Sequence, residues 1–494
     1  MRRPAVPILA LMLLAASPAG RAAPASRLPL APCELRSSGA LQLVKAECGR
    51  LAVAENPADP HGRQIHLAVA VVKAVSTVAR PDPLFVLAGG PGEAASTFYA
   101  GVASAFAGIH RDRDIVLVDQ RGTGGSNALV CPRRQDRGHG AQGPPTQAMI
   151  AAETERCLRR LRTHAHVRFY TTDLAVEDLE RVRAALGYHR IDLYGSSYGT
   201  VVAQEYLRRF PQRVRAVILD GVVPPQLPIG ALSALSAQRA VRRILRDCAA
   251  QRTCRARFGN PLAAYRRVRA ALSAHPVTLS VPDPTRGTPV RLRMTTYQLG
   301  EVLRLASYTP ALAALLPLDL HAAATGNYAP LAGQFLLIDR LYSGAVAAGM
   351  NNTVVCSEDV PFYRVSAQQR AAMRRTFLGL APLRDLATVC KLWPRGPVAT
   401  DFHAPLHSNV PVLLLSGSND PITPPRYAAE AARGYPHSLD LVVPGFGHGQ
   451  LLDPCVGRLM ARFIARASVQ DLNTRCIRRL HPPPFFLTLN GPAP

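Results

Sequence analysis

A serine between small residues lies at the centre of the segment LYGSSYGT, residues 193–200. Gly195, Ser197 and Gly199 fit the pattern G-x-S-x-G, which presents a nucleophilic serine on a tight turn between a strand and a helix. The backbone packs closely around such a turn, so the residues two before and two after the serine must lack side chains. Ser196 fails this test, and we expect it to be a buried neighbour. The sequence predicts that Ser197 is a catalytic nucleophile; the alternative is a plain turn that contains serine.

Ser197 would need a general base and an acid that orients this base. Hydrolases with this pattern carry them in the chain order serine, acid, histidine. Asp420 follows the apolar run VPVLLLSG, and His448 stands between two glycines after the next apolar run. We expect His448 to be the base and Asp420 to orient it, because the stretch between them has room for one helix and one strand.

Other acids and histidines suit these roles less well. His437 and Asp453 do not directly follow a strand end, and we interpret Asp220, which does, as structural. Asp420 alone could be a helix N-cap, and His448 alone a solvated histidine. Their joint position at successive strand ends favours the catalytic interpretation.

The segment AGGPGEAAS, residues 88–96, is predicted to supply one half of an oxyanion hole. Pro91 has no N–H to donate, so we assign the donor to Gly90. The second donor would be the main-chain N–H of Tyr198, the residue after the nucleophile. The alternative is a glycine-rich turn without a catalytic role.

The elements that must position these residues alternate between strand and helix patterns. Short apolar runs end in glycine-rich loops, as expected for strands buried on both faces of a parallel sheet. The predicted fold is therefore α/β, an open, doubly wound and mostly parallel sheet. The segments CGRLAVAEN and RQIHLAVAVVKA predict an antiparallel hairpin before it. The predicted strands lie at 83–90, 114–122, 190–197, 214–222, 410–420 and 439–445, and predicted helices include 173–187 and 200–210.

Residues 224–405 break this alternation, since they are rich in Leu, Ala and Arg at helical spacing. Such an insertion between two late strands of a parallel sheet would lie over the carboxyl edge as a cap. The predicted organisation is a signal peptide (1–25), an α/β core in two pieces (26–223 and 406–480), the mostly helical cap (224–405) and a proline-rich tail (481–494).

Composition bears on the partners and the compartment. The formal net charge is +25, but the arginines are spread along the chain and aromatic residues make up only 6%. This indicates a solvated basic surface and no nucleic-acid partner, with weak adhesion to anionic envelope surfaces left open. The start MRRPAVPILALMLLAASPAGRAAPA is typical of a cleaved secretory signal, and no later apolar run is long enough for stable membrane insertion.

Ten cysteines agree with an exported protein in an oxidising compartment. There is no C-x-x-C metal pair, and we expect neither a metal nor an organic cofactor. Sequence alone leaves the disulfide pairing open. Pairing of nearest neighbours would give five local bridges among cysteines 33, 48, 131, 157, 248, 254, 356, 390, 455 and 476.

Five motifs occur in order along the chain: GGPG (89–92), DQRGTGGS (119–126), GSSYG (195–199), DPITP (420–424) and GFGHG (445–449). Together they resemble the proline iminopeptidase and tripeptidyl aminopeptidase family of α/β-hydrolases, above all its secreted members with a TAP-like C-terminal segment. The resemblance covers residues 40 to 480 and implies a Ser-His-Asp exopeptidase that acts on free N-termini under a helical cap. Ala88 stands where proline iminopeptidases usually carry histidine, which favours the tripeptidyl branch. That branch includes enzymes assayed mainly as esterases, so ester substrates stay open.

Recognition of a protonated N-terminus would need a carboxylate, because a buried charge must be paired. Glu358 and Asp359, in VVCSEDVPF, are adjacent acids that resemble the C-x-D/E element of the family's cap. We expect Glu358 to be the first amine anchor and Asp359 the second; the alternative is a solvated acid pair. Asp119 and Arg121 are expected to brace the loops under the active site.

The sequence thus predicts an exported serine exopeptidase whose substrate is a peptide with a free amino terminus. A carboxylesterase or lipase-type hydrolase with the same catalytic residues is the first alternative. A secreted binding protein on a degenerate hydrolase scaffold is the second, and the intact set of five motifs disfavours it. The number of residues released, a preference for proline and the oligomeric state stay open.

Overall fold

The computed structural model describes residues 28–37, 43–131, 144–344 and 346–492. The predicted signal peptide lies outside these residues.

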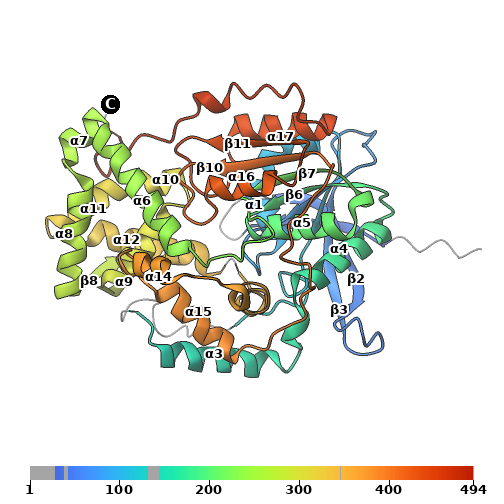
Figure 1. Ribbon diagram of the computed structural model, residues 1–494, viewed down its shortest axis with the longest axis horizontal. Coiled ribbons are helices and arrows are strands. Elements are labelled where there is room, and N and C mark those ends of the chain that lie inside the picture. The colour runs from blue at the N-terminus through green and yellow to red at the C-terminus, as the bar shows by residue number, and fades with distance from the viewer. Residues whose placement is uncertain (1–27, 38–42, 132–143, 345, 493–494) are drawn as a thin grey trace, which may run out of the picture.

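A nine-stranded sheet runs through the protein in the order β1-β2-β3-β5-β4-β6-β7-β10-β11 (Figure 1). Strands β1, β2, β3 and β5 pair antiparallel in that order, which includes the predicted hairpin. All other pairs are parallel, so the predicted mostly parallel α/β sheet is confirmed. The strands are β1 (Ala31–Arg36), β2 (Leu43–Ala54), β3 (Gln64–Val72), β4 (Leu84–Leu87), β5 (Ile115–Val118), β6 (Ile191–Ser196), β7 (Val214–Asp220), β10 (Val412–Gly417) and β11 (Ser438–Val443).

Alternate side chains of each core strand face opposite layers of helices. In β10, Val412 and Leu414 pack into one hydrophobic cluster, while Leu413 and Leu415 pack into the other. Because both faces are covered, β4 and β5 are apolar along their whole length, and the other core strands are mostly apolar. Helices α3, α4, α5 and α16 contribute to the first cluster, and α1, α2 and α17 to the second. Their bounds are α1 (Ala95–Val102), α2 (Ala107–His110), α3 (Gln147–Leu161), α4 (Thr172–Leu186), α5 (Tyr198–Arg209), α16 (Pro425–Ala432) and α17 (Pro454–Arg466).

The chain between β7 and β10 forms a cap on one side of the sheet (Figure 1). It is mostly helical and also contains a two-stranded antiparallel sheet that the sequence did not predict. The cap has a hydrophobic core of its own, in which Leu245, Leu292 and Leu303 are fully buried. Its elements are α6 (Ser233–Ala250), α7 (Arg252–Phe258), α8 (Pro261–Ala274), β8 (Val277–Pro282), β9 (Pro289–Met294), α9 (Thr296–Ala306), α10 (Pro310–Ala313), α11 (Leu316–Ala324), α12 (Ala329–Ser343), α13 (Ala348–Val354), α14 (Ala367–Arg374) and α15 (Ala381–Leu392).

Disulfides tie the chain together within local segments. Each joins a cysteine to its nearest neighbour in the sequence, which settles the pairing that the sequence alone left open. The five bridges are Cys33–Cys48, Cys131–Cys157, Cys248–Cys254, Cys356–Cys390 and Cys455–Cys476.

Among the described residues, no helix combines the length and the apolar character that crossing a membrane requires.

Candidate active site

Ser197 lies at the sharp turn between β6 and α5. Its φ of 51° and ψ of −117° are a conformation that residues with a side chain rarely adopt, and such strain is concentrated at functional positions. The flanking glycines permit the turn, because a Cβ on Gly195 would collide with the carbonyl of Gly199, and one on Gly199 with the carbonyl of Leu87. Ser196 is buried, whereas Ser197 is partly exposed. Ser197 is therefore the accessible serine of the pair.

Asp420 and His448 form a hydrogen bond of 2.7 Å between Oδ2 and Nδ1. They follow β10 and β11, whose carboxyl ends lie at the same edge of the sheet as the end of β6. The other oxygen of Asp420 accepts the N–H groups of Ile422 and Thr423, at 2.8 Å each, and the Thr423 hydroxyl donates to Oδ2 at 2.8 Å. A buried carboxylate held by this many donors has a fixed orientation. Thr423 was missed by the sequence analysis, although the motif DPITP contains it.

His448 is only 13% exposed and lies against the cap. Burial alone would lower its pKa, but nearby carboxylates, first that of Asp420, raise it above the ordinary value. Since Asp420 holds Nδ1, Nε2 is the nitrogen left to exchange a proton with a substrate. The main-chain N–H of His448 donates to the carbonyl of Tyr308 in the cap at 2.7 Å, and the two rings meet edge to face. No local pattern in the sequence could have identified Tyr308, because this contact depends on how the cap packs against the core.

Asp220, at the end of β7, connects the turn of Ser197 with the loop of His448. Its main-chain carbonyl accepts the N–H of Ser197 at 2.8 Å. Its buried carboxylate accepts the N–H of Gln450, at 2.8 and 2.9 Å to the two oxygens. The next residue, Gly221, lies beneath the imidazole, since a Cβ there would come within 2.9 Å of Cε1 of His448. These contacts bring the two loops together and support the structural role inferred for Asp220.

The glycine-rich loop after β4 packs directly against the serine turn. A Cβ on Gly89 would lie 2.8 Å from Cβ of Ser197, so only glycine allows this approach. Gly90 follows with a φ of 72°, in the left-handed region that favours glycine. Tyr198 is the first residue of α5, and its N–H therefore has no acceptor within the helix. The two N–H groups assigned to the oxyanion hole thus belong to two segments that meet at Ser197.

This arrangement matches a known family of enzymes. A family model for the alpha/beta hydrolase fold covers residues 82–454. The chain belongs to this family.

Relatives of this α/β hydrolase carry both peptidase and esterase names. The serine protease Hip1 of Mycobacterium tuberculosis is 27% identical over 473 residues, which cover 87% of each chain. A tripeptidyl aminopeptidase of Streptomyces coelicolor is 32% identical over 193 residues, covering 36% of this chain and 35% of that protein. Carboxylesterase B of M. tuberculosis is 28% identical over 475 residues, covering 87% and 86%. The predicted resemblance to the tripeptidyl aminopeptidase group is confirmed, and the protein is a serine hydrolase.

Glu93 is an ionisable residue of the hydrolase that the sequence analysis missed. It lies in the same loop as Gly90, and burial raises its pKa to about 8, which the Gly89 N–H and the charge of His448 offset only in part. An acid within an otherwise apolar, glycine-rich segment is the signal that could have found it. The negative charge of its carboxylate contributes to the raised pKa of His448.

The predicted amine anchors, Glu358 and Asp359, lie in a π-helical turn (Val355–Asp359) and are both buried. The two oxygens of Glu358 accept the N–H and the hydroxyl of Thr172, at 2.6 Å each. The same hydroxyl lies 2.7 Å from the phenolic oxygen of Tyr198. Burial raises the pKa of Glu358 well above its ordinary range. Glu358 is thus part of a buried polar network behind the first turn of α5.

Asp359 is less fully satisfied than its neighbour. Its Oδ1 accepts the N–H of Ile229 at 2.6 Å, whereas Oδ2 is buried without a hydrogen-bond partner among the described residues. Burial raises its pKa to about 8. A cavity of about 10 Å³ lies beside both acids, which is room for about one group the size of a water. Neither acid is a solvated surface residue.

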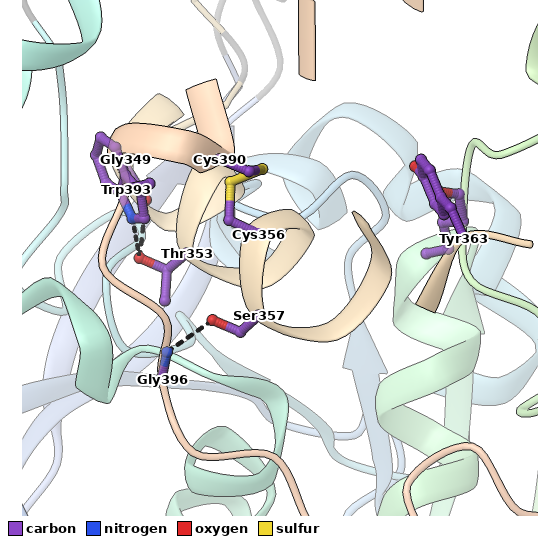
Figure 2. The surroundings of a disulfide bond; sticks show 9 residues. Gly349, Thr353, Cys356, Ser357, Tyr363, Cys390, Trp393 and Gly396 are labelled. Carbon is purple, nitrogen blue, oxygen red and sulfur yellow. Dashed lines mark hydrogen bonds between the residues drawn. A yellow bond between two sulfur atoms is a disulfide. The ribbon is translucent and has the colours of Figure 1, made fainter. Parts of the chain in front are cut away.

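A disulfide and a buried tryptophan hold this part of the hydrolase in place (Figure 2). The bond Cys356–Cys390 joins the π-helical turn to α15. Nε1 of Trp393 donates to the hydroxyl of Thr353 at 3.0 Å, one turn before the disulfide. The segment that leads into the two acids is therefore attached at two points to the end of α15 and the residue that follows it.

Asp119 and Arg121 brace loops below the site, as the sequence predicted. Arg121 is fully buried and forms two hydrogen bonds with the carboxylate of Asp178, at 2.7 and 2.8 Å. Asp119 accepts the N–H and hydroxyl of Ser96, at the start of α1, and the N–H of Gly125. Both side chains form their hydrogen bonds within the protein, which agrees with a structural role.

Proposed function

We propose that this hydrolase is an exported serine exopeptidase that releases residues from the free N-terminus of peptides. The observation that carries the proposal is the hydrogen-bonded pair of Asp420 and His448 beside the strained turn of Ser197. The relatives named as a serine protease and a tripeptidyl aminopeptidase favour peptides as substrates. The five disulfides favour export, because such bonds persist in oxidising compartments.

In the proposed reaction, Oγ of Ser197 attacks the carbonyl carbon while Nε2 of His448 takes its proton. Asp420 holds the imidazole in the required tautomer and stabilises the imidazolium. The N–H groups of Gly90 and Tyr198 donate to the oxyanion of the tetrahedral intermediate. His448 then protonates the leaving amine as the carbon–nitrogen bond breaks, which leaves an acyl-enzyme on Ser197. A water molecule repeats the sequence, releases the acyl group as an acid and restores the serine.

Action at chain ends is supported by how closely the cap approaches the catalytic loops. The N–H of Ala347 donates to the carbonyl of Gly92 at 2.9 Å, and Val346 lies close to Gly90. Together with the contact of Tyr308 with His448, these contacts place the cap against both catalytic loops, as expected of a site that admits the end of a peptide chain.

The amine of the substrate would be bound by one of the two buried acids beside the small cavity. Glu358 uses both oxygens for Thr172, so Asp359, with one unpartnered oxygen, is the better candidate of the two. A protonated amine has the size of a water and would fit the small cavity, but the attached residue would need the cavity to widen.

The test is to incubate the purified protein with one peptide in its free form and in its N-acetylated form, and to identify the products by mass. We expect the free peptide to lose residues from its N-terminus and the acetylated peptide to stay intact. The variant Ser197→Ala should cleave neither. Equal cleavage of both peptides would overturn the exopeptidase assignment, and full activity of Ser197→Ala would overturn the nucleophile.

A carboxylesterase is the second candidate, favoured by the relative of that name, which matches most of the chain. The same residues would perform this reaction, with an alcohol as the leaving group. A kcat/KM for p-nitrophenyl esters that exceeds the value for every free peptide by 100-fold or more would favour the esterase.

A further inference from the structure

An open cleft of about 730 Å³ lies between helix α6 of the cap and the loop that follows β10. Neither Ser197 nor His448 lines it, although Asp420 forms part of its wall. Four arginines of α6 recur at intervals of three and four residues and therefore share one face of the helix. A fifth comes from the first turn of α16. The arginines that line the cleft are Arg239, Arg242, Arg243, Arg246 and Arg426.

These side chains converge although they carry the same charge. Arg239 and Arg426 both donate to the hydroxyl of Ser236, at 3.1 and 3.4 Å. Burial, and then the charge of Arg426, lower the pKa of Arg239 below its ordinary value. Like charges at this spacing repel one another and destabilise both the helix and its contact with a neighbouring helix. An anion bound between the arginines would therefore offset a repulsion that is present in the free protein.

The cleft offers little negative charge of its own. Two acids line it, and Asp420 is already bound to His448, which leaves Asp247. None of the five arginines forms an ion pair within the part of the chain that the structure describes. On α3, by contrast, Arg156 and Arg159 lie at ion-pair distance from glutamates one turn earlier. The arginines of the cleft thus lack the neighbouring glutamates that accompany those of α3.

We propose that this arginine cleft binds the phosphate groups of a multiply charged anion. Guanidinium groups match phosphate oxygens with paired hydrogen bonds and stay charged at any physiological pH, which suits them to this ligand. The half-open cleft, with arginines on two elements, fits a compact anion with two or more charges. The phosphates can belong to a free polyphosphate or to the headgroup of an anionic lipid.

The cleft is also coupled to the catalytic loops by direct contacts. Nη1 of Arg243 donates to the carbonyl of Ser418 at 2.9 Å. The hydroxyl of Ser418 accepts the N–H of Gly445 at 2.8 Å, in the loop that leads to His448. An anion that orders Arg243 would therefore stabilise the loops of Asp420 and His448 against local unfolding, and raise the melting temperature.

The test is a calorimetric titration of the full-length protein with pyrophosphate at constant ionic strength set by KCl. The variant Arg242→Ala/Arg246→Ala should bind at least 10-fold more weakly, since it removes two lining charges whose side chains donate no hydrogen bond within the described chain. The matched control Arg156→Ala/Arg159→Ala removes the same charge from α3 and should bind as the parent does. Ser197→Ala should also bind unchanged, so the outcome is independent of the proposed peptidase activity.

Equal affinity of the cleft variant and the control variant, or no binding of pyrophosphate at all, would overturn the proposal. Co-sedimentation with vesicles identifies the source of the phosphate. If phosphatidylglycerol vesicles bind through the cleft and displace pyrophosphate, the ligand is a lipid headgroup. If pyrophosphate binds through the cleft and vesicles do not compete, it is a soluble phosphate compound. Binding of polyglutamate in place of pyrophosphate would count against phosphate as the ligand.

Discussion

The main-chain carbonyl of Asp220 accepts the N–H of Ser197 at 2.8 Å, while the carboxylate of the same residue holds the loop of His448. One buried residue thus fixes both the proposed nucleophile and the loop of its base. Neither contact involves a group that would touch the substrate. Asp220 is therefore a positioning residue, and its charge also contributes to the raised pKa of His448.

Replacing Asp220 with asparagine should lower kcat by roughly 10- to 100-fold with little change in KM, because small misplacements of reacting groups are costly. The new amide would oppose the N–H of Gln450, and the free energy of unfolding should fall by about 1–3 kcal/mol. Steady-state kinetics and thermal melting measure the two effects. Asp401→Asn, an exposed site, is the control. An unchanged kcat in Asp220→Asn would show that the loop of His448 is held without it.

Replacing Asp420 with asparagine should reduce kcat by about 10⁴-fold, as in other serine hydrolases in which the orienting acid is lost. Because the carboxylate of Asp420 raises the pKa of His448, its removal should lower that pKa. The imidazole acts as a base only when neutral, so the acidic limb of the kcat/KM profile should move to lower pH. Profiles between pH 4 and 9 for the parent and the variant measure this shift. If the acidic limb does not move, the titration of a group other than His448 controls it.

The sequence predicted the sheet and the order of the candidate catalytic residues because both are encoded locally. A strand buried on both faces has to be mostly apolar, and a serine turn has to be flanked by glycines. The hairpin β8–β9 was missed because it lies within a segment dominated by helical spacing. Its strands each contain or adjoin prolines, which weaken a strand pattern.

What the sequence could not predict depends on contacts between distant segments. Glu358 is buried because Thr172, far earlier in the chain, supplies two donors for its carboxylate. In the sequence, Glu93 resembles an ordinary acid of a solvated loop, and its burial depends on the cap that covers this loop. The arginine cleft likewise needs α6 to lie against the loop after β10, which no local pattern reveals.

Stability should depend on pH through Asp359. Its pKa is about 8 in the folded protein and near 4 in the unfolded chain, so the folded state binds more protons between these values. The free energy of unfolding contributed by this group is therefore highest below about pH 4 and declines as the pH rises to about 8, by at most about 1.4 kcal/mol per pH unit. Melting temperatures at pH 6 and pH 9 should differ less in Asp359→Asn, which keeps an acceptor for Ile229. An equal difference in melting temperature in the parent and the variant would contradict the raised pKa of Asp359.

Removing the disulfide Cys356–Cys390 by a double serine substitution should cost about 4 kcal/mol, because the bond closes a loop of 34 residues. The bridge Cys248–Cys254 spans only 6 residues, so its removal should cost about 2 kcal/mol and serves as the matched control. Thermal melting measures both.

The two disulfide variants also separate stability from recognition. The bond Cys356–Cys390 fixes the turn that holds Glu358 and Asp359, whereas the control bond lies at the far end of α6. If these acids anchor the substrate amine, loss of the first bond should raise KM for free peptides several-fold at a temperature where the variant is folded. KM for p-nitrophenyl esters, which have no amine to bind, should stay within twofold. Equal changes in KM for both substrates would show that the turn supports the fold of the site and does not bind the substrate amine.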